Sequence, residues 1–234
     1  MSLFTISDLH LSLNTNKSME VFGGVWNGYI EKLKENWNST VKENDVVVIP
    51  GDISWETYLK DAALDFKFLD NLNGKKIISK GNHDYWFLTV NKLKEFFKEN
   101  DISTIEMMHN NFFVYENVAI CGTKGTDISK RPTKEEDIKL ENREALRLEN
   151  SIIQAKEKGY NDIFVFMHYP PLLKNGKYND NIYGYILREY KVKKCFYGHL
   201  HTRSHHMAVN EISDGIEYKL VSSDYMDFKP LKIL

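Results

Sequence analysis

The chain has 234 residues, of which 42% are hydrophobic and 27% are charged, and its formal net charge is −2. A chain of this length can bury a large core, and we expect one domain over residues 1–234. Such a charge balance gives no general basic excess of the kind that attracts proteins to nucleic acids, so it disfavours a polynucleotide substrate.

The N-terminus and the hydropathy of the chain predict its location. The first residues run directly into polar motif residues, which leaves no room for a secretory signal. No apolar run approaches the roughly 20 residues that cross a bilayer. We therefore expect a cytoplasmic protein without a membrane partner. Cys121 and Cys195 lie in apolar, strand-like runs, so we expect buried thiols rather than a disulfide or metal ligands.

Short apolar runs that end abruptly in polar or glycine residues predict buried strands. They cover residues 3–6, 46–49, 76–78, 163–167 and 195–197. Apolar residues recur at helical spacing between them, within residues 26–41, 59–69, 90–97 and 133–158, and Gly159 follows the last helix as a stop signal. Residues 112–115 and 118–121 predict a hairpin, and residues 217–222 alternate like a strand. Strands that alternate with helices indicate an α/β domain.

The least regular segments are residues 123–132 and 170–181, which are rich in Gly, Pro, Lys and Asn. We expect them to be surface loops over a site. The first loop contains Lys124, Lys130 and Arg131, which either supply positive charge to a second phosphate or only keep the loop solvated.

Several aromatic residues follow the polar motifs. Trp55 and Trp86 either wall a pocket or pack between sheet and helix, and we favour packing for one of them. Tyr178, Tyr183 and Tyr185 are candidates for a lid or a substrate rim, with ordinary surface tyrosines as the alternative.

Potential metal ligands follow each of the five predicted core strands. They are Asp8 and His10 after the first, Asp52 after the second, Asn82, His83 and Asp84 after the third, His168 after the fourth, and His199 and His201 after the fifth. Each motif alone is weak and could be an ordinary turn. Because the carboxyl ends of strands in an α/β sheet share one edge, we expect all five segments to converge on one site.

The residue types in these segments suit a pair of metal ions. Carboxylate and amide oxygens mix with imidazole nitrogens and no thiolate is included, which leaves manganese, iron and zinc open. Two cations about 3.5–4 Å apart need a bridging carboxylate, and Asp52 stands between the other clusters in the sequence.

The ordered signature resembles that of calcineurin-like metallophosphoesterases. The matching motifs are Asp8-Leu9-His10, Gly51-Asp52, Gly81-Asn82-His83-Asp84, His168 and Gly198-His199-Leu200-His201. The resemblance spans residues 8–201 and implies a four-layer α/β/β/α sandwich, with two mixed β-sheets flanked by helices. It implies one metal ion held by Asp8, His10, Asp52 and His201, and a second held by Asp52, Asn82, His168 and His199. Asp52 bridges the two ions in that scheme.

Departures from the family pattern narrow the expected substrate. Residues 53–55 read Ile-Ser-Trp where protein Ser/Thr phosphatases have Asp-Arg-Gly, and Lys80 stands where those enzymes have arginine. A protein phosphatase is therefore disfavoured. Residues 51–55 and 80–86 resemble a bacterial group of predicted phosphohydrolases more than they resemble the protein Ser/Thr phosphatases.

The predicted function is metal-dependent hydrolysis of a small phosphomonoester or phosphodiester, by attack of a hydroxide that bridges the two metal ions. His83 is not assigned as a ligand, so we expect it to be catalytic, as a hydrogen-bond donor to the phosphoryl group or as the acid for the leaving oxygen. Asp84 either orients His83 or another imidazole, or begins a helix.

Two other functions remain as alternatives. A nuclease would show a basic groove lined with aromatic residues, which the sequence does not indicate. A non-catalytic metal-binding interaction module on the same fold would be expected to lack at least one ligand, and all seven are present. The partner we expect is a small phosphorylated substrate, and no oligomeric state is predicted.

Overall fold

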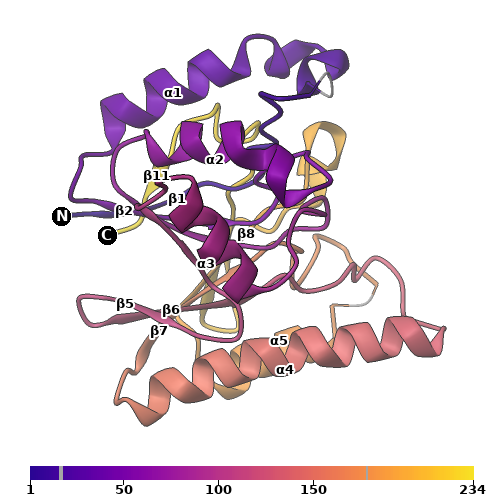
Figure 1. Cartoon of the computed structure of the whole chain (residues 1–234). Helices are drawn as coiled ribbons and strands as arrows, with labels where there is room; N and C mark the ends of the chain where they lie inside the picture. The colour runs from indigo at the N-terminus through magenta and orange to yellow at the C-terminus, as the bar shows by residue number, and fades with distance from the viewer. Residues whose placement is uncertain (16–17, 178) are drawn as a thin grey trace.

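The computed structural model describes residues 1–15, 18–177 and 179–234, which form two β-sheets packed face to face (Figure 1). The first sheet has the order β11-β1-β2-β3-β4, with β1 (Leu3–Thr5), β2 (Val46–Pro50), β3 (Lys75–Ser79), β4 (Ile105–Met107) and β11 (Leu231–Lys232). The second has the order β5-β6-β7-β8-β10-β9, with β5 (Phe113–Tyr115), β6 (Val118–Thr123), β7 (Asp162–Met167), β8 (Lys194–Tyr197), β9 (Ile212–Ser213) and β10 (Ile216–Leu220).

Helices cover the outer face of each sheet (Figure 1). The first sheet carries α1 (Tyr29–Thr40), α2 (Ala63–Asp70) and α3 (Val90–Glu99), and the second carries α4 (Glu135–Glu157) and α5 (Ile182–Glu189). Short 3-10 helices lie at Met19–Phe22, Gly24–Trp26, Leu59–Ala62 and Thr202–Met207. The succession of helices, first sheet, second sheet and helices confirms the predicted four-layer α/β/β/α sandwich.

Three apolar clusters hold these layers together. One lies between the two sheets and includes Val48 of β2 and Phe166 of β7. The second packs α1, α2 and α3 on the first sheet through residues such as Trp37, and the third packs α4 and α5 on the second sheet through residues such as Leu148. The helices α1 to α4 thus bury the apolar stripes that predicted them, whereas α5 was not predicted from the sequence.

The strand directions are those of a mixed sandwich. Strands β1 to β4 are parallel and β11 joins them antiparallel, while β6, β7, β8 and β10 are parallel with β5 and β9 antiparallel at the edges. The hairpin of β5 and β6 was predicted, and so was the end of α4, which Gly159 follows with φ of 89°. The buried free thiols Cys121 and Cys195 agree with the sequence as well.

The alternation of elements predicted one shared sheet edge, and the structure corrects this. Strands β1, β2 and β3 end on the first sheet, whereas β7 and β8 end on the second. The two sheets meet at this end because the chain after β1 bonds to the chain after β10: Ser7 N–H donates to Val221 O at 2.8 Å, and Ser223 N–H donates to Ser7 O at 2.9 Å. Convergence on one site therefore needs both sheets.

No helix among the described residues is both long enough and apolar enough to cross a membrane.

Lys76 on β3 is a buried cation that closes the end of α2. Its ammonium donates to Thr104 Oγ1 at 2.9 Å and to three main-chain carbonyl oxygens, those of Asp70 at the end of the helix and of Leu72 and Gly74 beyond it. The Asp70 carbonyl has no further helical turn to bond to, so Lys76 supplies a donor there and for the two carbonyls of the following turn.

We expect Lys76→Met to lower the free energy of unfolding by about 2–4 kcal/mol, because it leaves several buried carbonyl oxygens without a donor. Urea unfolding followed by circular dichroism measures the change. Lys75→Met, at the exposed neighbouring position, is the matched control and should stay within about 0.5 kcal/mol. Equal stability of the two variants would contradict the capping role.

Candidate metal centre

The predicted ligands lie together where the strands of both sheets end. Their ligand atoms form two overlapping groups, each with all its atoms within 4.8 Å of one another: Asp8, His10 and His201, and Asp8, Asp52 and His168. Asn82 adjoins the second group, because its Oδ1 lies 2.6 Å from His168 Nε2. Segments that are far apart in the sequence thus supply one cluster.

Two imidazole nitrogens face each other in the first group. His10 Nε2 lies 3.2 Å from His201 Nε2, which is also 3.3 Å from Asp8 Oδ1. Asp52 Oδ2 lies 3.7 Å from His10 Nε2. Imidazole nitrogens and carboxylate oxygens that converge in this way are a donor set for a divalent cation, so these residues fit a metal ion.

His168 presents its Nε2 atom to the second group. Its Nδ1 lies 3.2 Å from the carbonyl oxygen of Pro50, which accepts the Nδ1 hydrogen. The lone pair of Nε2 then faces Asn82 Oδ1 at 2.6 Å and Asp52 Oδ2 at 3.5 Å. Facing lone pairs repel unless a cation lies between them, so this group also fits a metal ion.

His199 contributes in another way. Its main-chain N–H donates to both carboxylate oxygens of Asp8 at 3.1 Å. Its ring centroid lies 4.2 Å from that of Tyr169 and 5.2 Å from that of His168. Among the described residues, the two clustered groups do not include this imidazole. The structure places His199 beside the cluster, and its role as a ligand stays a prediction.

Burial and neighbouring charges set the protonation of the cluster. Burial raises the pKa of the Asp52 carboxyl, and the negative charges of Asp84 and Asp8 raise it further. Burial would also raise the pKa of Asp8, but the surrounding imidazoles hold it well below its usual range. For His201, burial lowers the pKa, yet Asp8 and Asp224 outweigh that effect and raise it to about 10. Metal-free protein therefore holds a proton on His201 at neutral pH.

Several of the predicted ligands have a left-handed backbone. The φ angles are 59° at Asp8, 46° at His10, 51° at Asp52 and 69° at His199. Residues other than glycine rarely adopt this conformation, and it tends to occur at functional sites, where the surrounding structure holds it. The four positive φ angles therefore agree with a functional role for the loops that carry these side chains.

Gly81 and Gly198 allow a close approach of main chain to ligand. A Cβ atom at Gly81 would collide with the carboxylate and the main-chain nitrogen of Asp52, and one at Gly198 would collide with the Asp8 carboxylate and the Ser7 hydroxyl. Only glycine fits at either position without displacing a predicted ligand.

Asp84 has neither of the roles that the sequence suggested. It is fully buried and binds main chain rather than an imidazole, and α3 begins only at Val90, after the N-cap Thr89. Its carboxylate accepts five hydrogen bonds, from the main-chain N–H groups of Asp52, Ile53, Ser54 and Gly81 and from the Trp86 indole, at 2.7–3.2 Å. It therefore fixes the loop after β2 to the loop after β3.

Asp224 is a residue of the site that sequence reasoning missed. Its Oδ1 accepts from His201 Nδ1 at 2.8 Å, which leaves His201 Nε2 directed at the cluster. Its Oδ2 accepts from Thr202 N–H at 3.0 Å and lies 3.2 Å from His205 Nε2. The signal was present, because Asp224 follows the predicted strand at residues 217–222 as the other motifs follow theirs.

The two tryptophans take the two roles that the sequence suggested, one beside the cluster and one in the core, whereas Tyr183 differs from the prediction. Trp55 stacks on His10 with ring centroids 4.8 Å apart and contacts His83 at 4.3 Å, while Trp86 is fully buried in the core. Tyr183 is not part of a lid, because it is fully buried on α5 with its hydroxyl 2.9 Å from that of Thr126. Tyr185 is exposed on α5, and Tyr178 lies outside the described residues.

We expect Asp84→Asn to lower the free energy of unfolding by about 2–4 kcal/mol and to weaken metal binding, although Asp84 is no predicted ligand. The amide keeps the shape of the side chain but turns an N–H group towards main-chain donors. Guanidinium unfolding and metal titration of the same sample measure both effects. The control is Asp227→Asn at an exposed position, which should change neither, and an unchanged metal affinity in Asp84→Asn would contradict the positioning role.

Metal binding at His201 should release at least one proton at pH 7.5, because the raised pKa keeps this imidazole protonated until a cation displaces the proton. Apparent metal affinity should therefore rise with pH between 7 and 9, by about tenfold per unit. Calorimetric titration in two buffers of different ionisation enthalpy counts the protons. In Asp224→Asn the affinity should fall by about 10- to 100-fold and its pH dependence should flatten. A pH-independent affinity in the unsubstituted protein would exclude the protonated His201.

Comparison with known proteins agrees with this geometry. The family model for calcineurin-like phosphoesterases matches residues 1–203. No curated protein matches the chain at a significant level.

Solved structures share the fold at low sequence identity. The phosphopantetheinyl hydrolase PptH from Mycobacterium tuberculosis is similar with a TM-score of 0.55 at 15% identity, over 100% of this chain and 95% of that chain. AQ665, a protein of unknown function from Aquifex aeolicus, has a TM-score of 0.52 at 16% identity, over 99% and 95%. TT1561 of Thermus thermophilus has a TM-score of 0.53 at 11% identity, over 85% and 81%.

Proposed function

The chain belongs to the calcineurin-like phosphoesterase family, and from this premise we propose that it hydrolyses a small phosphomonoester or phosphodiester. We assign Asp8, His10, Asp52 and His201 to one metal ion, and Asp52, Asn82, His168 and His199 to a second. The observation that carries the proposal is the convergence of donors from both sheets, above all the approach of His10 Nε2 and His201 Nε2 to 3.2 Å beside Asp8.

The donor set suits manganese, iron or zinc, because carboxylate and amide oxygens are combined with imidazole nitrogens. Bound ions of this kind lower the pKa of water and offset negative charge on phosphoryl oxygens. Asp52 is the proposed bridge, since its Oδ2 lies within 3.7 Å of His10 and 3.5 Å of His168. Its other oxygen accepts from the His83 main-chain N–H at 2.8 Å, which orients the carboxylate.

His83 is the proposed catalytic residue. Its ring lies beside the cluster, 4.3 Å from Trp55 and 5.8 Å from His10 between centroids. Burial lowers the pKa of His83, and the charge of His201 lowers it further against the opposing effect of Asp8, which favours the neutral imidazole. A neutral imidazole still carries one N–H. We therefore favour hydrogen-bond donation to a phosphoryl or leaving oxygen over full proton transfer.

Two broader predictions accompany this proposal. The shared core between the sheets supports one domain over residues 1–234, and the cytoplasmic location stays a prediction from the sequence.

We expect His83→Ala to lower kcat by about 10²- to 10³-fold while the metal content per chain stays the same, because His83 acts on the substrate and not on the metal. The assay uses metal-stripped protein supplied with manganese, zinc or iron, and compares a nitrophenyl phosphomonoester with a bis-nitrophenyl phosphodiester. His206→Ala, at an exposed position on the same protein, is the control and should retain activity.

Two results would count against the proposal. If the protein binds metal stoichiometrically but hydrolyses neither ester with any of the three metals, the proposal of a general phosphoesterase is contradicted. Loss of metal in His83→Ala would make His83 a ligand rather than a catalytic residue.

A further inference from the structure

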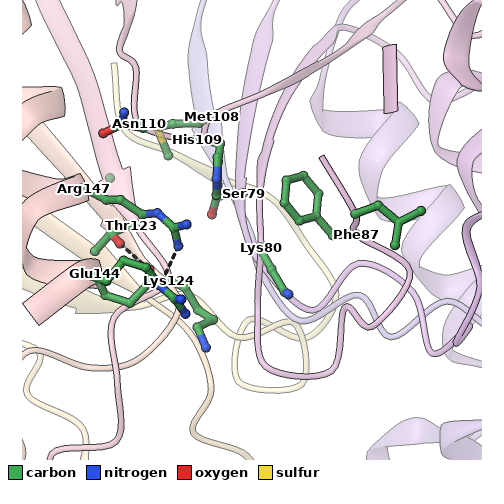
Figure 2. Close-up of a pocket in the computed structure, with 13 residues that line it drawn as sticks. Ser79, Lys80, Phe87, Met108, His109, Asn110, Thr123, Lys124, Glu144 and Arg147 are labelled. Carbon is green, nitrogen blue, oxygen red and sulfur yellow. Dashed lines mark hydrogen bonds and ion pairs between the residues drawn. The ribbon is translucent and has the colours of Figure 1, made fainter. Parts of the chain in front are cut away.

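A cavity of about 230 Å³ lies between the end of β3 on one side and the end of β6 and helix α4 on the other (Figure 2). Lys80 and Phe87 line one side of it, and Lys124, Glu144 and Arg147 line the other. The walls come from the end of β3, the loop after it, the end of β6 and helix α4. None of these residues belongs to the proposed metal sites.

The lining is strongly positive. It carries four cationic side chains, those of Lys80, Lys124, Arg143 and Arg147, against the single carboxylate of Glu144. The chain as a whole has a net charge of −2, so this concentration of positive charge is local. A concave surface lined by one sign of charge raises the local concentration of the opposite ion.

The single carboxylate is already engaged. Glu144 is buried, and it accepts from Arg147 Nη1 at 2.5 Å and from Thr123 Oγ1 at 2.8 Å (Figure 2). The two lysines lie over aromatic rings instead, with Lys80 Nζ 5.6 Å from the centre of Phe87. Within the described part of the chain, neither Lys80 nor Lys124 has a carboxylate at ion-pair distance. Their ammonium groups are available to an anion.

The cations also disfavour one another. Burial lowers the pKa of the Lys124 ammonium, and the charges of Lys80, Arg143 and Arg147 lower it further, against the opposing effect of Glu144. A bound anion would remove this repulsion and gain charge-assisted hydrogen bonds.

The residues that line the cavity are neighbours of predicted metal ligands. Lys80 precedes the predicted ligand Asn82 by two residues, so their Cα atoms lie within about 7 Å of each other. On the other side, Lys124 O accepts from the Tyr169 N–H at 2.9 Å, and the Tyr169 ring contacts that of His199 at 4.2 Å. Both walls of the cavity are therefore joined to predicted metal ligands through one or two neighbouring residues.

We propose that this cavity binds a second phosphate group of the substrate, so that the substrate class is a small phosphoester with another phosphoryl group a few atoms from the scissile one. The inference rests on the proposed phosphoesterase function and specifies its substrate. Of the three basic residues in the loop at 123–132, only Lys124 lines this cavity. Lys130 and Arg131 line neighbouring hollows that also contain acidic residues, so their charge is closer to balance.

The first test is binding of inorganic phosphate to the metal-free protein at low ionic strength, measured by calorimetry, because metal-free protein removes the catalytic centre as a binding site. The double variant Lys80→Gln/Lys124→Gln should weaken binding by about tenfold or more. The matched control is Lys92→Gln/Lys98→Gln, which removes two exposed charges from α3 and should stay within about twofold. Equal affinity in both double variants would overturn the anion site.

The second test separates a substrate phosphate from a free anion. It compares kcat/KM of the metal-loaded enzyme for a nitrophenyl phosphate and for the same aryl phosphate with a second phosphate on the ring. The second phosphate should raise kcat/KM by about tenfold, mainly through KM, and this preference should fall to about twofold or less in the Lys80→Gln/Lys124→Gln variant. The control variant should keep the preference.

The outcomes distinguish the two proposals. Phosphate binding without any preference for the doubly phosphorylated ester would overturn the substrate assignment and leave a site for free anions. Failure to hydrolyse either ester, with phosphate binding intact, would overturn the proposed function and the substrate assignment together.

Discussion

The buried carboxylate of Asp84 organises the centre of this molecule. One side chain accepts four main-chain N–H bonds and an indole N–H, and these donors belong to the turns that follow two neighbouring strands. Without it, the main-chain N–H groups of Asp52, Ile53 and Ser54 would lose their acceptor in a buried region. Asp52 can therefore keep a strained left-handed conformation, and its carboxylate stays directed at the imidazoles of both sheets.

The same arrangement explains why the centre needs two sheets. A single parallel sheet places its strand ends in a row, whereas here Asp8, Asp52 and Asn82 come from one sheet and His168, His199 and His201 from the other. The apolar cluster between the sheets holds the two sets at a fixed separation. Close main-chain contacts at Gly81 and Gly198 complete the fit, since a methyl group at either position would displace a carboxylate. The packing of the two sheets on each other thus stabilises a small region in which residues have a left-handed backbone and carboxylates lie close together.

Much of this was predictable because the signals are local. A short apolar run followed by Asp, Asn or His marks the end of a buried strand, and that rule located the clustered residues and the strands that carry them. Asp224 obeys the same rule after β10 and could have been found by it.

The bonds of Asp84 to Asp52, about thirty residues earlier, leave no local trace, so the sequence offered only an imidazole partner or a helix start. Tyr183 looked like a lid residue because nothing in its neighbourhood showed that α5 would bury it. The cationic cavity was equally hidden, since Lys80 and Arg147 come to line the same cavity only after the sheets pack.

The two-sheet origin of the centre has a consequence for synthesis of the protein on the ribosome. Asp8 and His10 are made early, whereas His199 and His201 follow β8 and are made only after the strands β1 to β8. The partial chain therefore exposes isolated carboxylates and imidazoles that lack the partners needed for tight metal capture. The complete set of predicted donors exists only once β8 and the residues after it have been made and the second sheet has docked on the first. A metal ion at the proposed centre would therefore be captured only after the two sheets have packed together.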